Sequence, residues 1–425
     1  MARLLGLKFH RHRASTTDEG VRWTRVSGPG LAGFPQLVWD DGHPWREANL
    51  WALELLDAGL DLKSVQANLA AVQAYATWLE QSGSHWAHFP ARKADRCLIR
   101  YRGALVEARN LGRIAASTAT QRMRVVVRFY RWLQMSGLLA SNWPLWNERR
   151  IDIRLFDAQG FERTVSAQTT DLAIPNRTRP GDRLEGGLLP VSASDRDAIL
   201  EFSRCHGTEE LFLMLSLGFF TGMRLGTITD LKIETIDRAV PDPAAPGLWR
   251  LAVGPGADPP VATKQGVTGH IWITSEHLQI LRGYARSVRR LLREAHATGL
   301  NRDLLFLTRY GNPYAQRGAE RSPAINVELH ALRHRARSHA VSALQHFRFH
   351  QTRCTFATEL ARILISSKNR INPIAIIQEA LLHRNEATSL RYIRFVERSA
   401  VKEQVANAFT QAFLGLAKKE RNSHA

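Results

Sequence analysis

Two stretches of helical periodicity, separated by a break rich in Gly and Pro, constrain the fold of this chain most strongly. Apolar residues recur at steps of three and four positions through residues 45–137, the spacing of one face of an α-helix. Helical patterns return from Leu189 onward, whereas Gly and Pro break any regular pattern in residues 138–189. The chain is also long for one domain, at 425 residues. We therefore expect two lobes joined by a connector.

The first lobe, residues 45–137, is expected to hold four amphipathic helices. Leu50, Leu53 and Leu56 mark the first helix, which Gly59 ends. The other three are expected over residues 65–79, 95–110 and 118–135, with Ser117 as the N-cap of the last. That last helix also carries Arg122, Arg124, Arg128 and Arg131. These arginines either form a solvated face or contact DNA phosphates.

The second lobe, residues 190–398, is expected to be mainly helical with one antiparallel strand pair. Ser192 or Ser194 caps a helix that runs to about residue 206, and the very apolar helix over residues 209–222 must be buried. Residues 249–253 and 270–274 alternate in polarity and predict the two strands. Further helices are expected over residues 276–296, 324–344, 353–365 and 374–382.

The two ends of the chain are less regular. Residues 1–44 show little periodicity and are predicted to form an irregular arm of unknown role, with one short strand near residues 36–39. Residues 399–425 are predicted to form a closing helix over 399–416, capped by Ser399, and a polar tail. The fold class is thus mainly α with a small antiparallel β-sheet.

The charge balance points to a polyanionic partner. The chain has 58 Lys and Arg against 39 Asp and Glu, a net charge of +19 and a pI near 10.6. Nucleic acid is the first candidate, because Lys and Arg that neutralise phosphates release counterions and so drive binding. The other interpretations are solubility by charge, or a ribosome-associated or membrane-surface protein.

Several classes of protein are disfavoured. Cys97, Cys205 and Cys354 lie far apart without a CxxC pair, which excludes a zinc ribbon and disfavours a disulfide framework. No apolar run approaches the roughly 18 residues that span a bilayer. Clustered carboxylates with metal-ligand spacing are missing as well, so we expect no metal, no cofactor and no membrane partner. A cytoplasmic protein is the simplest expectation.

Two groups of residues in the second lobe are candidates for phosphate binding. Arg224 follows Gly222, where a buried helix is predicted to end, and Lys264 lies between the two predicted strands. His350 and Arg353 are three residues apart at the start of a predicted helix, a place that favours anions. Taken singly, each could equally be a capping residue or a solvated surface cation.

A histidine and a late tyrosine complete the set of candidates. His383 precedes Tyr392 by nine positions. Two arginines, one lysine, two histidines and one tyrosine can together transfer a phosphoryl group without metal. The guanidiniums stabilise the charge of the transition state, a histidine helps to deprotonate the phenol, and the lysine protonates the leaving alkoxide. The tyrosine would form a covalent intermediate, so that no ATP is needed.

The order Arg, Lys, His-x-x-Arg, His, Tyr resembles that of the tyrosine site-specific recombinases, the phage-integrase family. The local contexts are similar too: TGMRLGTITDL to the first motif of the family, HQTRCTFATEL to the second and ALLHRNEATSLRYI to the third. The resemblance implies that Tyr392 is the nucleophile, that Arg224 and Arg353 hold the phosphate, and that Lys264 is the general acid. His350 and His383 would then assist proton transfer and phosphate binding.

The resemblance also implies an architecture and partners. Residues 45–137 would be a core-binding domain that forms a C-shaped clamp on double-stranded DNA with the catalytic domain, residues 190–398. Cleavage would leave a 3′-phosphotyrosine, and strand exchange would proceed in a homotetramer or together with related recombinases. The closing helix would dock on a neighbouring subunit or pack on its own domain. The alternatives are a type IB topoisomerase and a DNA-binding regulator of the same fold that does not cleave.

Three positions depart from the family pattern. Thr227 stands where an acidic residue usually supports the first arginine, Cys354 where a histidine is common, and Leu382 where the third motif usually has Gly. Leu is expected to alter the turn before His383, because Gly-only dihedrals are closed to it.

Overall fold

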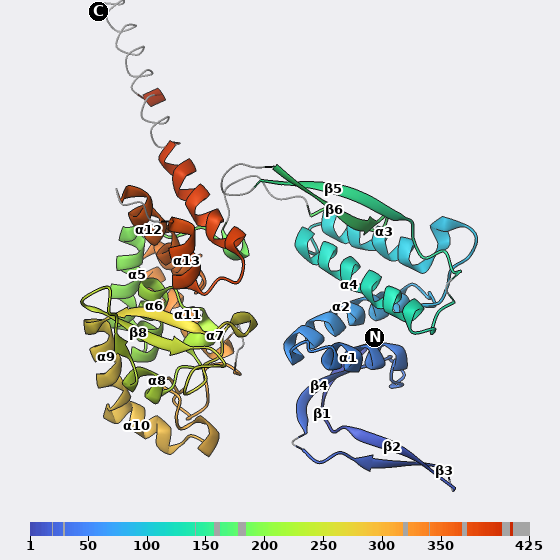
Figure 1. Ribbon diagram of the computed structural model, residues 1–425, viewed down its shortest axis with the longest axis horizontal. Helices are drawn as coiled ribbons and strands as arrows, with labels where there is room; N and C mark the ends of the chain where they lie inside the picture. Colours follow the sequence, from blue (N-terminus) through green and yellow to red (C-terminus); the bar gives the residue numbers. More distant parts are fainter. Residues whose placement is uncertain are drawn as a thin grey trace, which may run out of the picture. The chain divides into compact units, whose positions relative to one another are not determined.

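The computed structural model describes residues 1–18, 20–28, 30–140, 142–156, 162–176, 184–317, 322–339, 341–367, 372–401 and 409–410. The chain divides into two compact units, Met1–Arg179 and Pro180–Ala425 (Figure 1). The boundary falls inside the predicted connector, of which residues 141, 157–161 and 177–183 lie outside the described residues. The finer division into five segments stays a prediction.

Four helices form the centre of the first unit, close to the four predicted ranges: α1 (Arg46–Asp57), α2 (Leu62–Gln81), α3 (Cys97–Asn110) and α4 (Ala116–Met135). Aromatic side chains fill the core between them. The hydroxyls of Tyr75 and Tyr130 lie 2.7 Å apart, and Tyr130 donates to the carbonyl of Trp86, so that buried polar atoms are satisfied. The N-cap of α4 is Ala115 and not Ser117, which lies inside the first turn.

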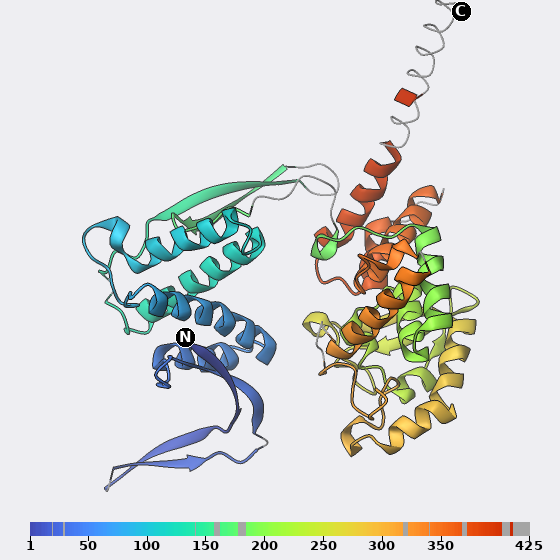
Figure 2. The same cartoon turned by 180° about the vertical axis from the view of Figure 1, so that it is seen from behind.

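The expectation of an irregular N-terminal arm was wrong, although the short strand predicted near residues 36–39 coincides with the end of the strand Leu31–Val38. β1 (Arg3–Phe9) pairs antiparallel with β4 (Leu31–Val38), and β2 (His12–Thr17) pairs with β3 (Gly20–Arg25). Phe34 and Leu37 of β4 are buried in the same core as the helices. The β2–β3 hairpin extends away from the helices in both views (Figures 1 and 2). Because β2 and β3 are exposed, their sequences lack the alternation that marks a half-buried strand.

The predicted connector also contains regular structure. Strands β5 (Glu148–Phe156) and β6 (Glu162–Thr170) pair antiparallel in register from end to end. The segments that flank this hairpin join the core of the first unit through Leu145, Leu172 and Ile174. Residues 138–176 are therefore largely part of the first unit and not a free link. The sequence did not predict this hairpin, because β6, ERTVSAQTT, is polar along most of its length.

The second unit is mainly helical around one small sheet. Its labelled helices are α5 (Ala193–His206), α6 (Glu209–Thr221), α7 (Leu225–Ile228), α8 (Ile233–Asp237), α9 (Ser275–Ala285), α10 (Val288–Ala295), α11 (Pro323–Ser338), α12 (Gln351–Ser366) and α13 (Pro373–Leu381). A further helix is described from residue 386 to residue 401. The sheet is antiparallel, in the order β7 (Val240–Pro241), β8 (Leu248–Val253) and β9 (Gly269–Thr274). Short 3-10 turns of this unit occur at η2 (Glu185–Gly187), η3 (Lys264–Gly266), η4 (Gly299–Asn301) and η5 (Ser342–Leu344), whereas η1 (Lys93–Asp95) belongs to the first unit. The predicted fold class, mainly α with a small antiparallel β-sheet, is confirmed.

Helix α6 lies at the centre of this unit and is buried on nearly all sides, as its apolar sequence predicted. Ser192 caps α5, in agreement with one of the two predicted caps. A Cβ on Gly218 of α6 would lie 2.4 Å from Oγ1 of Thr352, so α6 and α12 approach closely at this point. This contact fixes the start of α12 against the end of α6, where the candidate site lies.

Three of the predicted helices differ in their bounds from the structure. The helix expected over 324–344 is α11, which ends at Ser338, and residues 342–344 form the separate turn η5. The helix expected over 276–296 is two helices, because Ser287 accepts a hydrogen bond from the backbone N–H of Arg290 and caps α10. Ser399 is no N-cap, since it lies within a helix that the structure describes from residue 386 to residue 401. The rest of the predicted closing helix lies outside the described residues, except positions 409 and 410. Within the described part of the chain, no helix is long and apolar enough to cross a membrane.

Candidate active site

Arg353 is the most deeply buried cation of the site, with 2% of its surface exposed in the first turn of α12. Its Nη1 donates to the carbonyl of Gly222 at 2.7 Å and its Nη2 to the carbonyl of Leu381 at 2.8 Å. These carbonyls end α6 and α13, where helices leave acceptors unpaired. Burial, and then the charge of Arg224, lower the pKa of Arg353 to about 10, so the guanidinium stays charged at neutral pH.

Gly222 positions Arg224 in the same site as Arg353. Gly222 is the C-cap of α6 with φ +66°, and a Cβ there would lie 2.4 Å from the ring of Phe356. Both the left-handed backbone and the lack of space require glycine. The chain then turns into α7, with Arg224 as its N-cap residue. The side chain of Arg224 is 16% exposed, and its buried Nε, like that of Arg353, has no hydrogen-bond partner among the described residues.

Lys264 lies where the sequence placed it, between β8 and β9, in the turn η3. A small pocket is lined by Lys264 together with Arg224 and Arg353. The approach to this turn is held by a buried ion pair that the sequence analysis missed. Asp230 pairs with Lys232 at 2.9 Å and accepts a hydrogen bond from the backbone of Ala262, two residues before Lys264.

His383 and Tyr392 are both buried and belong to neighbouring elements. His383 follows α13, and its Nδ1 lies 3.0 Å from Oγ of Ser389. Tyr392 lies in the helix that begins at residue 386, with its ring plane 10° from that of His383 and 6.1 Å between the ring centroids. Burial lowers the pKa of His383 and raises that of Tyr392. The phenol is therefore protonated at neutral pH and needs a base before it can attack.

Glu185, which the sequence analysis did not single out, occupies the centre of the site. Its Oε1 lies 2.7 Å from Nε2 of His383, 3.2 Å from the hydroxyl of Tyr392 and 3.7 Å from Nε of Arg353. Its Oε2 lies 3.5 Å both from Nη2 of Arg224 and from Nε2 of His350. Five of the six predicted site residues thus surround one carboxylate, and the sixth lines the adjoining pocket.

The pKa of Glu185 is set by its burial and by the cations and hydrogen-bond donors that surround it. Burial by itself would raise the pKa of the carboxyl. Hydrogen bonds from His350 and His383, with the charges of Arg353 and Arg224, outweigh burial and hold the pKa well below its usual range. The site therefore stabilises an anion strongly. No motif could have revealed this residue, since it lies 198 positions before His383 in a stretch read as connector.

The three departures from the family pattern are accommodated locally. Thr227 lines the pocket beside Arg224, and Cys354 is buried in the cluster that contains Tyr392. The expected change of the turn at Leu382 was wrong: Leu382 adopts the left-handed conformation, with φ 51° and ψ 50°. Gly269 makes room for it, because a Cβ there would lie 2.5 Å from Cδ2 of Leu382.

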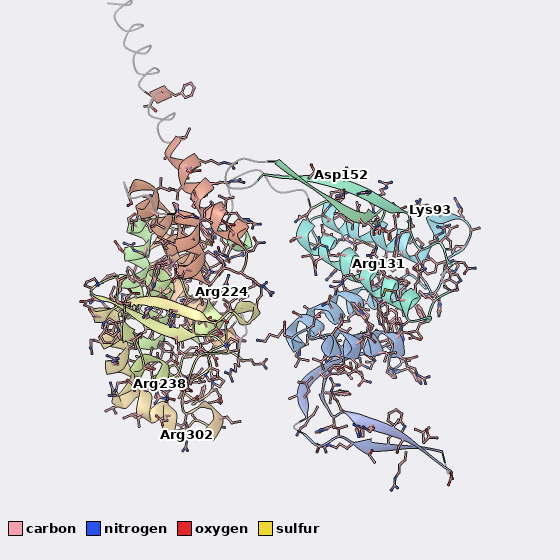
Figure 3. All side chains as sticks on the ribbon, in the orientation of Figure 1. Lys93, Arg131, Asp152, Arg224, Arg238 and Arg302 are labelled. Atoms are coloured by element: carbon pink, nitrogen blue, oxygen red, sulfur yellow. The ribbon has the colours of Figure 1, made fainter. Side chains whose placement is uncertain are left out.

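The four candidate DNA-binding arginines of α4 divide into two groups. Arg124, Arg128 and Arg131 are exposed, and their spacing places them on one helix face. Arg131, labelled in Figure 3 together with Arg224 of the second unit, pairs with Glu148 at 2.8 Å and lies over the ring of Trp146. Arg122 is half-buried on the other side of the helix. Their contact with DNA stays a prediction.

The fold is that of the tyrosine recombinases, as the order of the site residues led us to expect. A structure of the Tn1549 transposon integrase with transposon right end DNA has a TM-score of 0.50 at 13% identity, covering 84% of this chain and 98% of that one. The same integrase with a circular intermediate DNA gives 0.50 at 14% identity, covering 84% and 99%. A lambda integrase dimer on a core site gives 0.47 at 14% identity, covering 82% and 94%. No protein-family model and no curated protein sequence matches this chain.

Proposed function

We propose that this chain is a site-specific DNA recombinase of the integrase type, which cuts and rejoins DNA through Tyr392. One observation carries the proposal: Arg224, His350, Arg353, His383 and Tyr392 converge on a single anionic group. A scissile phosphate is the anion that this set of donors and a buried phenol would recognise. The net charge of +19 fits a DNA partner.

The reaction exchanges one phosphodiester for another. The phenol oxygen of Tyr392 forms a bond to phosphorus, and the bond to the 5′ oxygen breaks, which leaves a 3′-phosphotyrosine and a 5′-hydroxyl. The proton of the phenol passes to a histidine, and Lys264 protonates the leaving oxygen. Arg224 and Arg353 neutralise the charge that grows on the non-bridging oxygens. Attack by a 5′-hydroxyl reverses these steps and reseals a strand, so that neither ATP nor metal is required.

The buried guanidiniums support this assignment of roles. Both Nη atoms of Arg353 are held by backbone carbonyls, which fixes the guanidinium before any DNA arrives. The remaining N–H groups at Nε of Arg353 and Nε of Arg224 have no hydrogen-bond partner among the described residues. Preorganised donors of this kind cost no reorganisation when the transition state forms. As in the family it resembles, the enzyme would act on double-stranded DNA as a homotetramer or with related recombinases.

Covalent trapping tests the proposal. Nicked suicide duplexes, made from DNA that flanks the gene, are incubated with the wild type, with Tyr392→Phe and with Tyr310→Phe. Tyr310 is an exposed tyrosine, 63% accessible, and is the matched control. We expect a protein–DNA adduct on a denaturing gel with the wild type and with Tyr310→Phe only, and equal DNA binding by all three proteins. Specific binding without any wild-type adduct would instead support a non-cleaving regulator, and relaxation of any supercoiled plasmid a topoisomerase.

A further inference from the structure

The carboxylate of Glu185 occupies the position that the proposed function assigns to a phosphate. A carboxylate offers two oxygens, and a phosphodiester likewise offers two non-bridging oxygens. Each oxygen of Glu185 is shared between several donors of the site. Oε1 faces His383, Tyr392 and Arg353, whereas Oε2 faces Arg224 and His350. A phosphate held by the same donors would overlap this carboxylate and repel its charge. The two anions therefore exclude each other.

The backbone on both sides holds Glu185 in this place. Leu184 is buried in the cluster that includes Tyr392. On the other side, Gln351 donates to the carbonyl of Leu189 at 3.0 Å, and the N–H of Val191 donates to Thr355 at 3.0 Å. Between these anchors the chain makes the single turn η2, closed by Gly187 with φ +74°. The carboxylate is thus tethered at high effective concentration, and none of these anchors involves its side chain.

We propose that Glu185 is an internal competitor for the scissile phosphate and keeps the recombinase site closed to anions until bound DNA displaces it. This inference rests on the proposed function for the identity of the phosphate, but the competition itself concerns any phosphate-like anion. The alternative role for Glu185, a base that takes the proton of Tyr392, requires the carboxylate to remain in the site during catalysis. The overlap with the phosphate argues against that role.

The expected size of the effect follows from the population of the open site. If the carboxylate occupies the site about nine-tenths of the time, the apparent affinity for a competing anion falls about tenfold. Removal of the negative charge should restore that affinity. Shortening the side chain by one methylene should act in the same direction, because the carboxylate would no longer reach all of its partners.

The test compares the full-length wild type with Glu185→Gln, Glu185→Asp and the matched control Glu201→Gln. Glu201 is an exposed carboxylate on α5 that pairs with Arg204 at 2.8 Å. Inorganic phosphate is titrated while thermal unfolding is followed, which reports in the same experiment whether each variant folds. We expect both Glu185 variants to bind phosphate about tenfold more tightly than the wild type, and Glu201→Gln to match the wild type.

A second measurement separates failure of this inference from failure of the proposed function. Adduct formation on the suicide duplex is timed for the same four proteins, and we expect both Glu185 variants to react faster than the wild type. Unchanged or weaker phosphate binding by folded Glu185 variants would overturn the inference, and slower adduct formation would do so in favour of the base role. Tighter phosphate binding with no adduct from any protein would uphold the competition while contradicting the proposed recombinase.

Discussion

Nε2 of His383 and Oε1 of Glu185 lie 2.7 Å apart, although 198 positions separate the two residues in the sequence. The ionised carboxylate can only accept, so Nε2 donates and the neutral ring leaves Nδ1 to accept from Ser389. This fixes the tautomer of a residue that the proposed mechanism uses for proton transfer. The same carboxylate orders the phenol of Tyr392, so a single side chain organises both partners of the first proton transfer in the closed site.

The two arginines should differ in what their removal does to stability. We expect Arg224→Ala and Arg353→Ala each to slow adduct formation by about a hundredfold or more, because each removes a preorganised charge. Arg353→Ala should also lower the free energy of unfolding by a few kcal/mol, since the carbonyls of Gly222 and Leu381 lose their donor. Arg224→Ala should lower the free energy of unfolding by less, because Glu185, the partner of Arg224, keeps its contacts with His383 and Tyr392. Urea unfolding beside the suicide-duplex assay checks both effects, and equal stability losses would contradict the distinction.

Leu382 provides a test of backbone strain beside His383. A left-handed residue with a side chain costs about 1–2 kcal/mol relative to glycine. Leu382→Ala keeps this strain and loses packing on Gly269, whereas Leu382→Gly loses the packing but relieves the strain. We therefore expect Leu382→Gly to be more stable than Leu382→Ala by about 1 kcal/mol in urea unfolding. A less stable glycine variant, the usual order at positions with negative φ, would show that the turn is not left-handed.

Stability should fall on mild acidification because of His277. Burial lowers the pKa of His277 from 6.5 to about 4. Below about pH 6.5 this histidine is therefore protonated in the unfolded chain and neutral in the native state. The free energy of unfolding falls as the pH falls, until the native pKa is reached. At about pH 5 the loss should be roughly 2 kcal/mol relative to pH 7. Urea unfolding of wild type and His277→Leu at both pH values isolates this residue, since the other titrating groups are common to both; parallel pH dependences would refute the prediction.

The arginines of α4 should contribute to DNA binding according to their exposure. We expect the double variant Arg124→Ala, Arg128→Ala to bind duplex DNA more weakly and to reduce the slope of log K against log salt by about 2. Arg122→Ala is the matched control, because Arg122 is half-buried on the other side of the helix. Gel-shift titrations at several salt concentrations measure the slopes. A double variant that behaves like Arg122→Ala would identify the exposed arginines as a merely solvated face.

The sequence by itself determined those features that depend on neighbours along the chain. Helical periodicity located the four helices of the first unit and α5, α6, α12 and α13 to within a few residues, because the residues that share a helix face are three and four positions apart. It missed α7, α8 and the helix from residue 386 to residue 401. The same locality placed Gly222 at a helix end, Ser192 at a cap, and His350 beside Arg353 at a helix start. The order of the six site residues then sufficed to expect a tyrosine-recombinase fold, which the structure has.

Only the tertiary structure decided which distant groups complete the site. Strands β1, β2 and β3 and the β5–β6 hairpin are held by cross-strand partners and carry little alternation of their own, so local pattern did not reveal them. The carbonyls that fix Arg353 come from the ends of two other helices, and Glu185 comes from a stretch without any motif. Burial and charge of this kind arise when the chain folds back on itself. For that reason the sequence identified the cations of this site, and the fold alone revealed the anion among them.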